Sequence, residues 1–195
     1  MEQYTIKIPE RLQFTDDEFF DFCQENRGRG LDFERNPNGE IIIMAPAGGI
    51  TGDKNGELTA DLKMWNRTVG VGKAFDSSTG FILPNGATRS PDASWLEKSR
   101  WDALTEEQQA KFVPLCPDFV AELTSPSDTL RKTQEKMKEW MDNGCRLGWL
   151  FHPKAEKTFI YRAGKSEPEE IDGYDRTLSG EEVLPGFHFD LKWLK

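Results

Sequence analysis

The chain has 195 residues, a formal net charge of -9 and 36% hydrophobic residues. This hydrophobic content supports a folded core and excludes an acidic disordered chain. No change in composition suggests a linker, so we expect one domain over residues 1–195. The acidic balance argues against a protein that grips nucleic acid over its whole surface, because Lys and Arg supply most of the non-specific affinity for phosphate.

Membrane, secreted and zinc-binding classes find no support in the sequence. No window approaches the ~18 apolar residues of a membrane helix, and the N-terminus lacks a basic region followed by an apolar run. The 3 cysteines are widely spaced and accompanied by only 2 histidines, which favours neither a disulfide framework nor a Cys/His zinc site. We therefore expect a cytoplasmic protein without membrane contact.

The N-terminal part of the chain predicts a short helix and a hairpin. Thr15 and Glu18 have the spacing of a capping box, and Gly28 is expected to end the helix. The turn Asn36-Pro-Asn-Gly39 joins two extended segments, residues 33–35 and 40–45, into a β-hairpin.

A longer helix is predicted next, followed by extended segments. Its apolar residues recur at helical spacing over residues 53–67: they are Leu58, Leu62, Trp65 and, just beyond, Val69. Extended segments are expected around Phe75 and at residues 80–83 and 89–95.

The second half of the chain predicts a strand, helix, strand unit. A polar helix is expected over residues 101–111, where Thr105 and Gln108 have capping-box spacing. The segment 125–128 signals the start of another helix, whose apolar stripe is Leu130, Thr133, Met137, Trp140 and Met141. Strands are expected at residues 119–123, 147–151, 158–162, 167–172 and 183–194. The unit at 118–151 indicates an α/β fold with a parallel strand pair.

Two acids stand out in the sequence, and one of them, Glu122, is costly to bury unless a positive group meets its carboxylate. Asp92 follows a proline at a strand start, and Glu122 lies within an otherwise apolar strand. Because side chains alternate along a strand, Asp118, Val120 and Thr124 are expected to share the face of Glu122.

The helix that follows offers the positive partner. At about 100° per residue, its apolar stripe leaves Lys136 on the flank, while Glu135 and Glu139 are expected to point to solvent. Lys136 can therefore lean over the sheet, and Lys132 and Lys138 are less favourably placed.

These segments together resemble a known family. The chain is similar to the family named "putative restriction endonuclease", long known as a domain of unknown function and common in cyanobacteria. The resemblance rests on Gly80-Phe-Ile-Leu-Pro-Asn-Gly-Ala-Thr-Arg-Ser-Pro-Asp92, Pro117-Asp-Phe-Val-Ala-Glu-Leu-Thr-Ser-Pro-Ser127, Lys136, Asn143-Gly144 and Trp149-Leu-Phe-His-Pro153. It covers nearly the whole chain and implies the PD-(D/E)XK nuclease superfamily. We therefore expect a restriction-endonuclease-like fold, with a mixed central sheet flanked by helices.

The resemblance implies roles for individual residues. Asp92 matches the Pro-Asp acid of the superfamily, and Glu122 matches the acid of its (D/E)XK strand. Thr124 stands where that motif has its lysine, and Lys136 matches a helix lysine that appears in this family. An upstream helix acid often completes the site; Glu57 and Asp61 are the candidates, and Asp118 and Thr124 are further possible members.

The implied cofactor is Mg²⁺ or Mn²⁺, held by Asp92 and Glu122. Mg²⁺ prefers oxygen ligands and usually binds through one or two carboxylates together with substrate phosphates and waters. The metal would acidify a water and stabilise charge on the phosphate, while the ammonium of Lys136 would orient that water or neutralise the phosphate.

Structural roles are the alternative for each of these residues. Asp92 could cap a turn, and Glu122 could form a buried structural ion pair with Lys136. Lys136 could also be a lysine at the helix edge that extends its charged end to solvent. Asp118 fits a strand start near the surface better than a ligand. Ser125 and Ser127 fit a helix start better than a nucleophile.

The favoured function is a metal-dependent endonuclease that hydrolyses DNA phosphodiester bonds. A single-site enzyme that cuts both strands favours a two-fold homodimer. A catalytically silent nuclease fold, kept as a binding or assembly module, stays open because the strand lysine is missing and the surface is acidic. A metal hydrolase for a small phosphorylated substrate also stays open, and it would suit the net charge.

Overall fold

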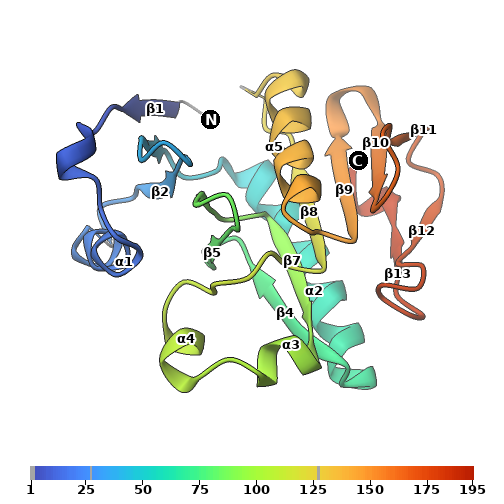
Figure 1. Cartoon of the computed structure of the whole chain (residues 1–195). Coiled ribbons are helices and arrows are strands. Elements are labelled where there is room, and N and C mark those ends of the chain that lie inside the picture. Colours follow the sequence, from blue (N-terminus) through green and yellow to red (C-terminus); the bar gives the residue numbers. More distant parts are fainter. Residues whose placement is uncertain (1–2, 27, 127) are drawn as a thin grey trace.

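A mixed six-stranded sheet forms the centre of the molecule (Figure 1). The computed structural model describes residues 3–26, 28–126 and 128–195. In spatial order the central strands are β11 (Glu169–Asp172), β10 (Lys157–Arg162), β9 (Leu147–His152), β8 (Phe119–Leu123), β7 (Ala93–Glu97) and β4 (Gly72–Asp76). Strands β8 and β9 are parallel, as the sequence predicts, and the other neighbouring pairs are antiparallel.

A second, antiparallel sheet lies beside the central one, on the left in Figure 1. In spatial order its strands are β1 (Gln3–Ile6), β3 (Ile41–Met44), β2 (Asp32–Arg35), β6 (Thr88–Arg89) and β5 (Phe81–Ile82). The predicted hairpin forms β2 and β3, with Arg35 paired to Ile41. The sequence did not indicate that β1 and β6 would join this hairpin in a separate sheet.

Helices flank these sheets, which confirms the expected fold class. They are α1 (Asp16–Glu25), α2 (Gly49–Val69), α3 (Lys98–Asp102), α4 (Glu106–Ala110) and α5 (Leu130–Asp142), with 3-10 turns η1 (Glu10–Leu12), η2 (Pro153–Ala155) and η3 (Leu191–Leu194). Among the described residues, no helix combines the length and apolar character that crossing a bilayer requires.

Several predicted boundaries were wrong. Helix α2 begins at Gly49 and not near residue 53, since Gly48 takes the N-cap position in extended conformation. The polar helix expected over residues 101–111 is two helices, because the capping box of Thr105 starts a new one. Of the C-terminal strand expected over residues 183–194, only β13 (His188–Asp190) forms; it pairs with β12 (Thr177–Ser179), and η3 follows it.

The start of α5 also differs from the prediction. Thr129 is its N-cap residue, and the Thr129 side chain accepts a hydrogen bond from the backbone N–H of Lys132. The helix therefore begins after the predicted start at residues 125–128, of which Ser127 lies outside the described residues.

The central sheet has two buried faces. One packs against α2 and carries alternate side chains of β8, including Phe119 and Leu123. The opposite face packs against α5, where Val120 of β8 shares a core cluster with Trp140 of the helix. Because side chains alternate along a strand, Glu122 lies on the α5 face.

Candidate active site

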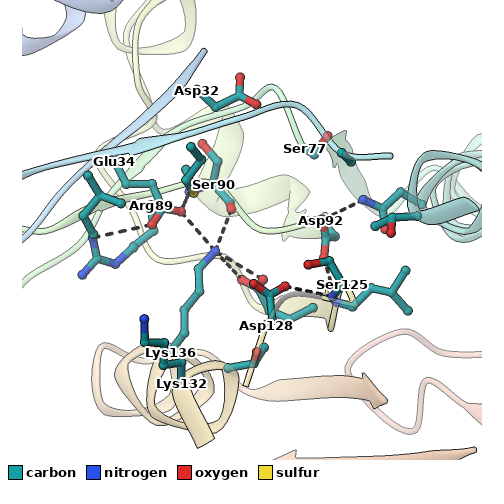
Figure 2. A pocket seen from close by; sticks show the side chains of 18 of the residues that line it. Asp32, Glu34, Ser77, Arg89, Ser90, Asp92, Ser125, Asp128, Lys132 and Lys136 are labelled. Carbon is teal, nitrogen blue, oxygen red and sulfur yellow. Dashed lines mark hydrogen bonds and ion pairs between the residues drawn. The ribbon is translucent and has the colours of Figure 1, made fainter. Parts of the chain in front are cut away.

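A pocket of about 710 Å³ lies between the second sheet, the first half of α2, and α5 (Figure 2). Acidic side chains outnumber basic ones around it. The carboxylates are Asp32, Glu34, Asp92, Glu122, Asp128, Glu135 and Glu139, and the basic side chains are Arg89, Lys132 and Lys136. The pocket therefore offers negative charge to any ligand that enters it.

Asp92 reaches the pocket from the residue just before β7. The antiparallel register pairs Ala93 with Ala121, so Asp92 comes opposite Glu122. Its Oδ2 accepts from the backbone N–H of Leu123 at 2.7 Å, and its Oδ1 accepts from Asn55 Nδ2 at 2.7 Å. Burial raises the pKa of Asp92, although the Leu123 N–H and Lys136 oppose the rise.

Glu122 is buried on β8, with 5% of its surface exposed. Its Oε1 accepts from Trp140 Nε1 at 2.9 Å and lies 3.0 Å from Lys136 Nζ. Burial raises the pKa of Glu122 to about 7; Lys136 opposes the rise, while the carboxylates of Asp92 and Glu34 add to it.

Lys136 is the cation that these carboxylates share. Its Nζ lies 3.0 Å from Glu122 Oε1 and 3.0 Å from Glu34 Oε1, and it donates to the backbone oxygen of Ser90 at 3.0 Å (Figure 2). Burial alone would lower the pKa of Lys136, but the carboxylates of Glu122, Glu34 and Asp92 raise it. The lysine therefore keeps its proton, and one ammonium faces three acids.

Glu34 belongs to this cluster, and the sequence reasoning missed it. The residue lies on β2, is 3% exposed, and accepts from the backbone N–H of Ser90 at 3.0 Å. The short charged stretch around it shows no periodicity that would predict burial. Its only sequence signal is an acid next to Arg35 on a hairpin strand.

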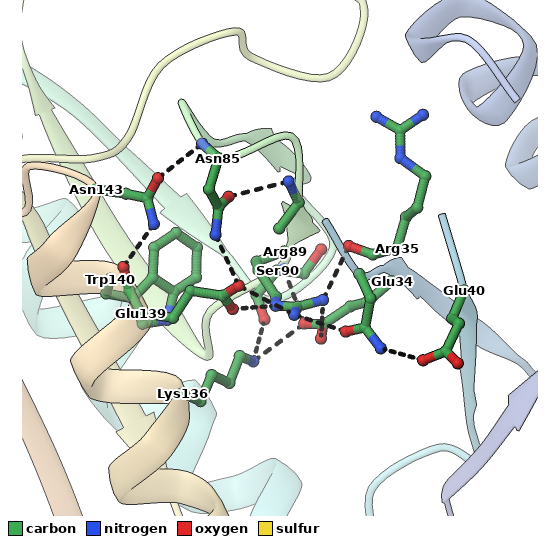
Figure 3. Close-up of polar contacts among 12 residues, drawn as sticks. Glu34, Arg35, Glu40, Asn85, Arg89, Ser90, Lys136, Glu139, Trp140 and Asn143 are labelled. Atoms are coloured by element: carbon green, nitrogen blue, oxygen red, sulfur yellow. Dashed lines mark hydrogen bonds and ion pairs between the residues drawn. The ribbon is translucent and has the colours of Figure 1, made fainter. Parts of the chain in front are cut away.

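A second ion pair ties the second sheet to α5 (Figure 3). Arg89 Nε donates to Glu139 Oε2 at 2.6 Å, and Arg89 Nη1 donates to the backbone oxygen of Arg35 at 3.0 Å. Glu139 also accepts from Asn85 Nδ2 at 3.0 Å. The expectation that Glu139 points to solvent was wrong, because β6 brings Arg89 against this side of α5.

The other acids suggested by the sequence lie outside the pocket lining. Asp118, at the opposite end of β8, is 2% exposed and pairs with Arg100 at 2.8 Å, so it is not near the surface as expected. Asp61 faces Asp190, whose charge adds to burial in raising the Asp61 pKa. Glu57 does not line the pocket.

Thr124, at the position of the superfamily's strand lysine, is buried and does not line the pocket either. Its hydroxyl is hydrogen-bonded to His152 Nδ1 at 2.8 Å. From helix α2, Thr51 and Asn55 line the pocket, and Asn55 donates to Asp92; the sequence reasoning missed both.

The donor set suits a hard divalent cation that keeps part of its water shell. Among the described residues, no three His, Cys, Asp or Glu side chains are grouped closely enough to form a protein-only metal cage. Mg²⁺, however, is usually bound through one or two carboxylates with waters and substrate phosphates. Asp92 and Glu122 fit that pattern, because both carboxylates are held in a pocket with excess negative charge.

Comparisons with known proteins identify the family and the fold. Residues 16–192 match the model of the Uma2 family, described as "Putative restriction endonuclease". The crystal structure of "a putative nuclease belonging to DUF820" from Anabaena variabilis aligns with a TM-score of 0.74 and 20% identity, covering 93% of this chain and 99% of that chain. At this identity the likeness shows the fold alone. The search of curated proteins finds no match.

Proposed function

This chain belongs to the Uma2 family, described as "Putative restriction endonuclease", and from that premise we propose that it hydrolyses DNA phosphodiester bonds with a divalent metal ion. Asp92 and Glu122 are the proposed ligands of Mg²⁺ or Mn²⁺, and Lys136 is the proposed catalytic cation. We also propose that residues 1–195 act as one domain and that two copies form a cytoplasmic homodimer, so that both strands of a duplex are cut.

The observation that carries the proposal is the charge imbalance around Lys136. Its ammonium lies 3.0 Å from Glu34 and 3.0 Å from Glu122, and it interacts with Asp92 as well. Buried carboxylates are usually paired, because an ionised group without a partner costs several kcal/mol. A divalent cation beside Asp92 and Glu122 would supply the missing positive charge.

Each residue of the cluster has a distinct task in this proposal. Asp92 and Glu122 bind the ion, and the backbone N–H of Leu123 and the indole of Trp140 keep the two carboxylates in place. A bound Mg²⁺ or Mn²⁺ supplies an acidified water and stabilises charge on the phosphate. Lys136 holds its proton at Nζ, and it can donate to the water or to a phosphate oxygen when that oxygen replaces one of its three present acceptors, which are Glu34, Glu122 and the backbone oxygen of Ser90.

An acidic pocket can accept a phosphate only when cations neutralise it. Lys132 lies on α5 one turn before Lys136, lines the pocket and is exposed. We assign it to contacts with the DNA backbone, because it is the basic side chain nearest the solvent around this pocket. This contact would make substrate binding sensitive to salt.

A catalytically silent module remains the competing function, and one observation favours it. The ammonium of Lys136 is already engaged by two carboxylates, and the strand position that usually carries a lysine is Thr124, bonded to His152. In that case the same cluster would be a structural ion network with no turnover.

Plasmid cleavage separates these functions. Purified protein is incubated with supercoiled plasmid in Mg²⁺ or Mn²⁺, and nicked and linear products are measured. We expect Asp92→Asn, Glu122→Gln and Lys136→Ala each to lower the rate by at least roughly 100-fold, as loss of electrostatic stabilisation at a reacting centre does.

Glu57→Gln is the matched control, since it removes a carboxylate from α2 outside the pocket and should leave the rate unchanged. No nicking by folded wild-type protein in either metal would contradict the nuclease and favour the silent module. Sedimentation velocity tests the dimer independently.

A further inference from the structure

Asn55 uses only half of its side-chain amide. Its Nδ2 donates to Asp92 Oδ1 at 2.7 Å, while its Oδ1 is buried without a hydrogen-bond partner among the described residues. The contact with Asp92 determines the orientation of the amide, because the opposite orientation would place a carbonyl oxygen against a carboxylate oxygen. The unpartnered atom is therefore the oxygen.

A structural asparagine on the same helix behaves differently. Asn66 donates through Nδ2 to the backbone oxygen of Gly72 at 2.9 Å and accepts through Oδ1 from Trp95 Nε1 at 2.9 Å. Both ends of its amide are satisfied, as is usual for a polar side chain that holds a fold together. Asn55 breaks that rule at the edge of the proposed metal site.

The position of Asn55 makes the exception informative. Asp92 receives one hydrogen bond on each carboxylate oxygen, from Leu123 on β8 and from Asn55 on α2. These two donors orient the carboxylate between a strand and a helix. An unsatisfied acceptor next to a proposed metal ligand costs stability in the metal-free protein, and a hydrogen-bond donor or a cation would relieve that cost.

We propose that Asn55 is a residue of the metal site, which positions Asp92 through its amide nitrogen and serves the bound ion or its waters through its free oxygen. Mg²⁺ keeps several waters in protein sites, and each of these waters is a hydrogen-bond donor. Asn55 thereby occupies the role that an upstream helix acid has in the superfamily. This inference rests on the metal-dependent hydrolysis proposed above.

Metal binding itself tests the assignment, without relying on cleavage. Mn²⁺ is titrated into the full chain by isothermal titration calorimetry, and the rise in Tm with Mn²⁺ is measured alongside. We expect Asn55→Ala to weaken Mn²⁺ binding by roughly 10- to 100-fold, the usual effect of losing a residue that orients a metal ligand. The metal-induced rise in Tm should shrink accordingly.

Asn66→Ala is the matched control on the same helix. It should lower Tm equally with and without Mn²⁺, because its contacts with Gly72 and Trp95 are remote from the pocket. Asn55→Asp restores an oxygen while losing the donor, so it should bind Mn²⁺ more tightly than Asn55→Ala and lower Tm in the metal-free protein. This variant also keeps the test valid if Asn55→Ala does not fold.

The outcomes separate the two proposals. Wild-type protein that binds no Mn²⁺ would overturn the metal site as a whole, and Asn55 with it. Wild-type protein that binds Mn²⁺ while Asn55→Ala binds it equally well would overturn the role of Asn55 alone. Equal affinity of Asn55→Asp and Asn55→Ala would overturn the role of the oxygen.

Discussion

A buried acid lies at each end of β8, and the two acids differ in how much positive charge surrounds them. Asp118, at the start, meets Arg100 at 2.8 Å and Arg146 at 3.6 Å and also accepts from the backbone N–H of Glu97 at 2.8 Å. Glu122, near the end, shares the one ammonium of Lys136 with Glu34. Two arginines serve Asp118 at the first end. At the second end the ammonium of Lys136 is shared by Glu122 and Glu34, and Arg89 Nη1 lies 3.7 Å from Glu34 but has no ion pair with Glu122 among the described residues.

This difference distinguishes a structural carboxylate from one that is available to a ligand. A buried acid with more than enough positive charge stabilises the fold and has no need of a metal. A buried acid with too little positive charge around it keeps the raised pKa that burial gives it, as Glu122 does. A cation that binds beside it relieves the cost of ionising the carboxyl. Substituting the buried acid at either end of β8 tests this difference.

The largest expected effect is the loss of stability in Asp118→Ala. The change removes a 2% exposed carboxylate, so Arg100 loses this acceptor, Arg146 keeps its contact with Glu97 at 3.2 Å, and the Glu97 N–H is left unpaired. Breaking a buried ion pair costs about 3 kcal/mol. Urea unfolding should show that loss, while the stabilisation by Mn²⁺ should be unchanged. A loss below about 1 kcal/mol would mean that the arginines around Asp118 contribute little to the stability of the fold.

Glu122→Gln should change stability in the opposite direction. In metal-free protein at pH 8 the wild-type carboxylate is ionised against its raised pKa of about 7, and the neutral amide avoids this cost. We expect a net gain on the order of 1 kcal/mol or less in the free energy of unfolding, because loss of the ion pair with Lys136 offsets most of the cost of ionising the buried carboxyl. Urea unfolding in EDTA measures it, and a destabilised variant would show that Glu122 is primarily a structural partner of Lys136.

The same imbalance predicts a pH dependence for the metal-free wild type. Well below pH 4.5, Glu122 is protonated in both states. Between about 4.5 and 7 the unfolded chain releases this proton while the folded chain retains it, so rising pH favours unfolding; above 7 the slope ends. Asp92, whose pKa is also raised, contributes with the same sign.

The slope from one such group is at most about 1.4 kcal/mol per pH unit. Unfolding free energies at several pH values should show it in the wild type and show less of it in Glu122→Gln. A wild-type protein that gains stability over this range would contradict the raised pKa.

Local patterns were enough to predict much of this arrangement. Alternation along β8 and the helical stripe of α5 depend on neighbours within a few residues, and they indicated correctly that Glu122 and Lys136 would face each other. The parallel pair of β8 and β9 followed from the strand, helix, strand unit. The mixed sheet flanked by helices was expected for the same reasons and from the family resemblance.

Contacts between distant segments could not be predicted. Glu34 reaches Lys136 only because β2 and β6 form a separate sheet against α5, and the pairing of Arg89 with Glu139 has the same origin. On α2 the superfamily pattern predicts a carboxylate, so Asn55, which is an amide, was not predicted as a site residue. Glu57 is two residues further, about 200° around the helix, and so faces another way.

The smallest expected effect concerns the helix acids that the sequence offered for the site. Glu57→Gln changes a side chain of α2 outside the pocket lining, so the free energy of unfolding should shift by less than about 0.5 kcal/mol. Mn²⁺ affinity should also stay the same, because none of the described contacts links Glu57 to Asp92. Asp61→Asn should likewise leave Mn²⁺ affinity unchanged, since Asp61 interacts with Asp190 at the C-terminal segment. Calorimetric titration of both variants with Mn²⁺ checks this. Weaker binding by either variant would show that an acid of α2, and not Asn55, completes the metal site.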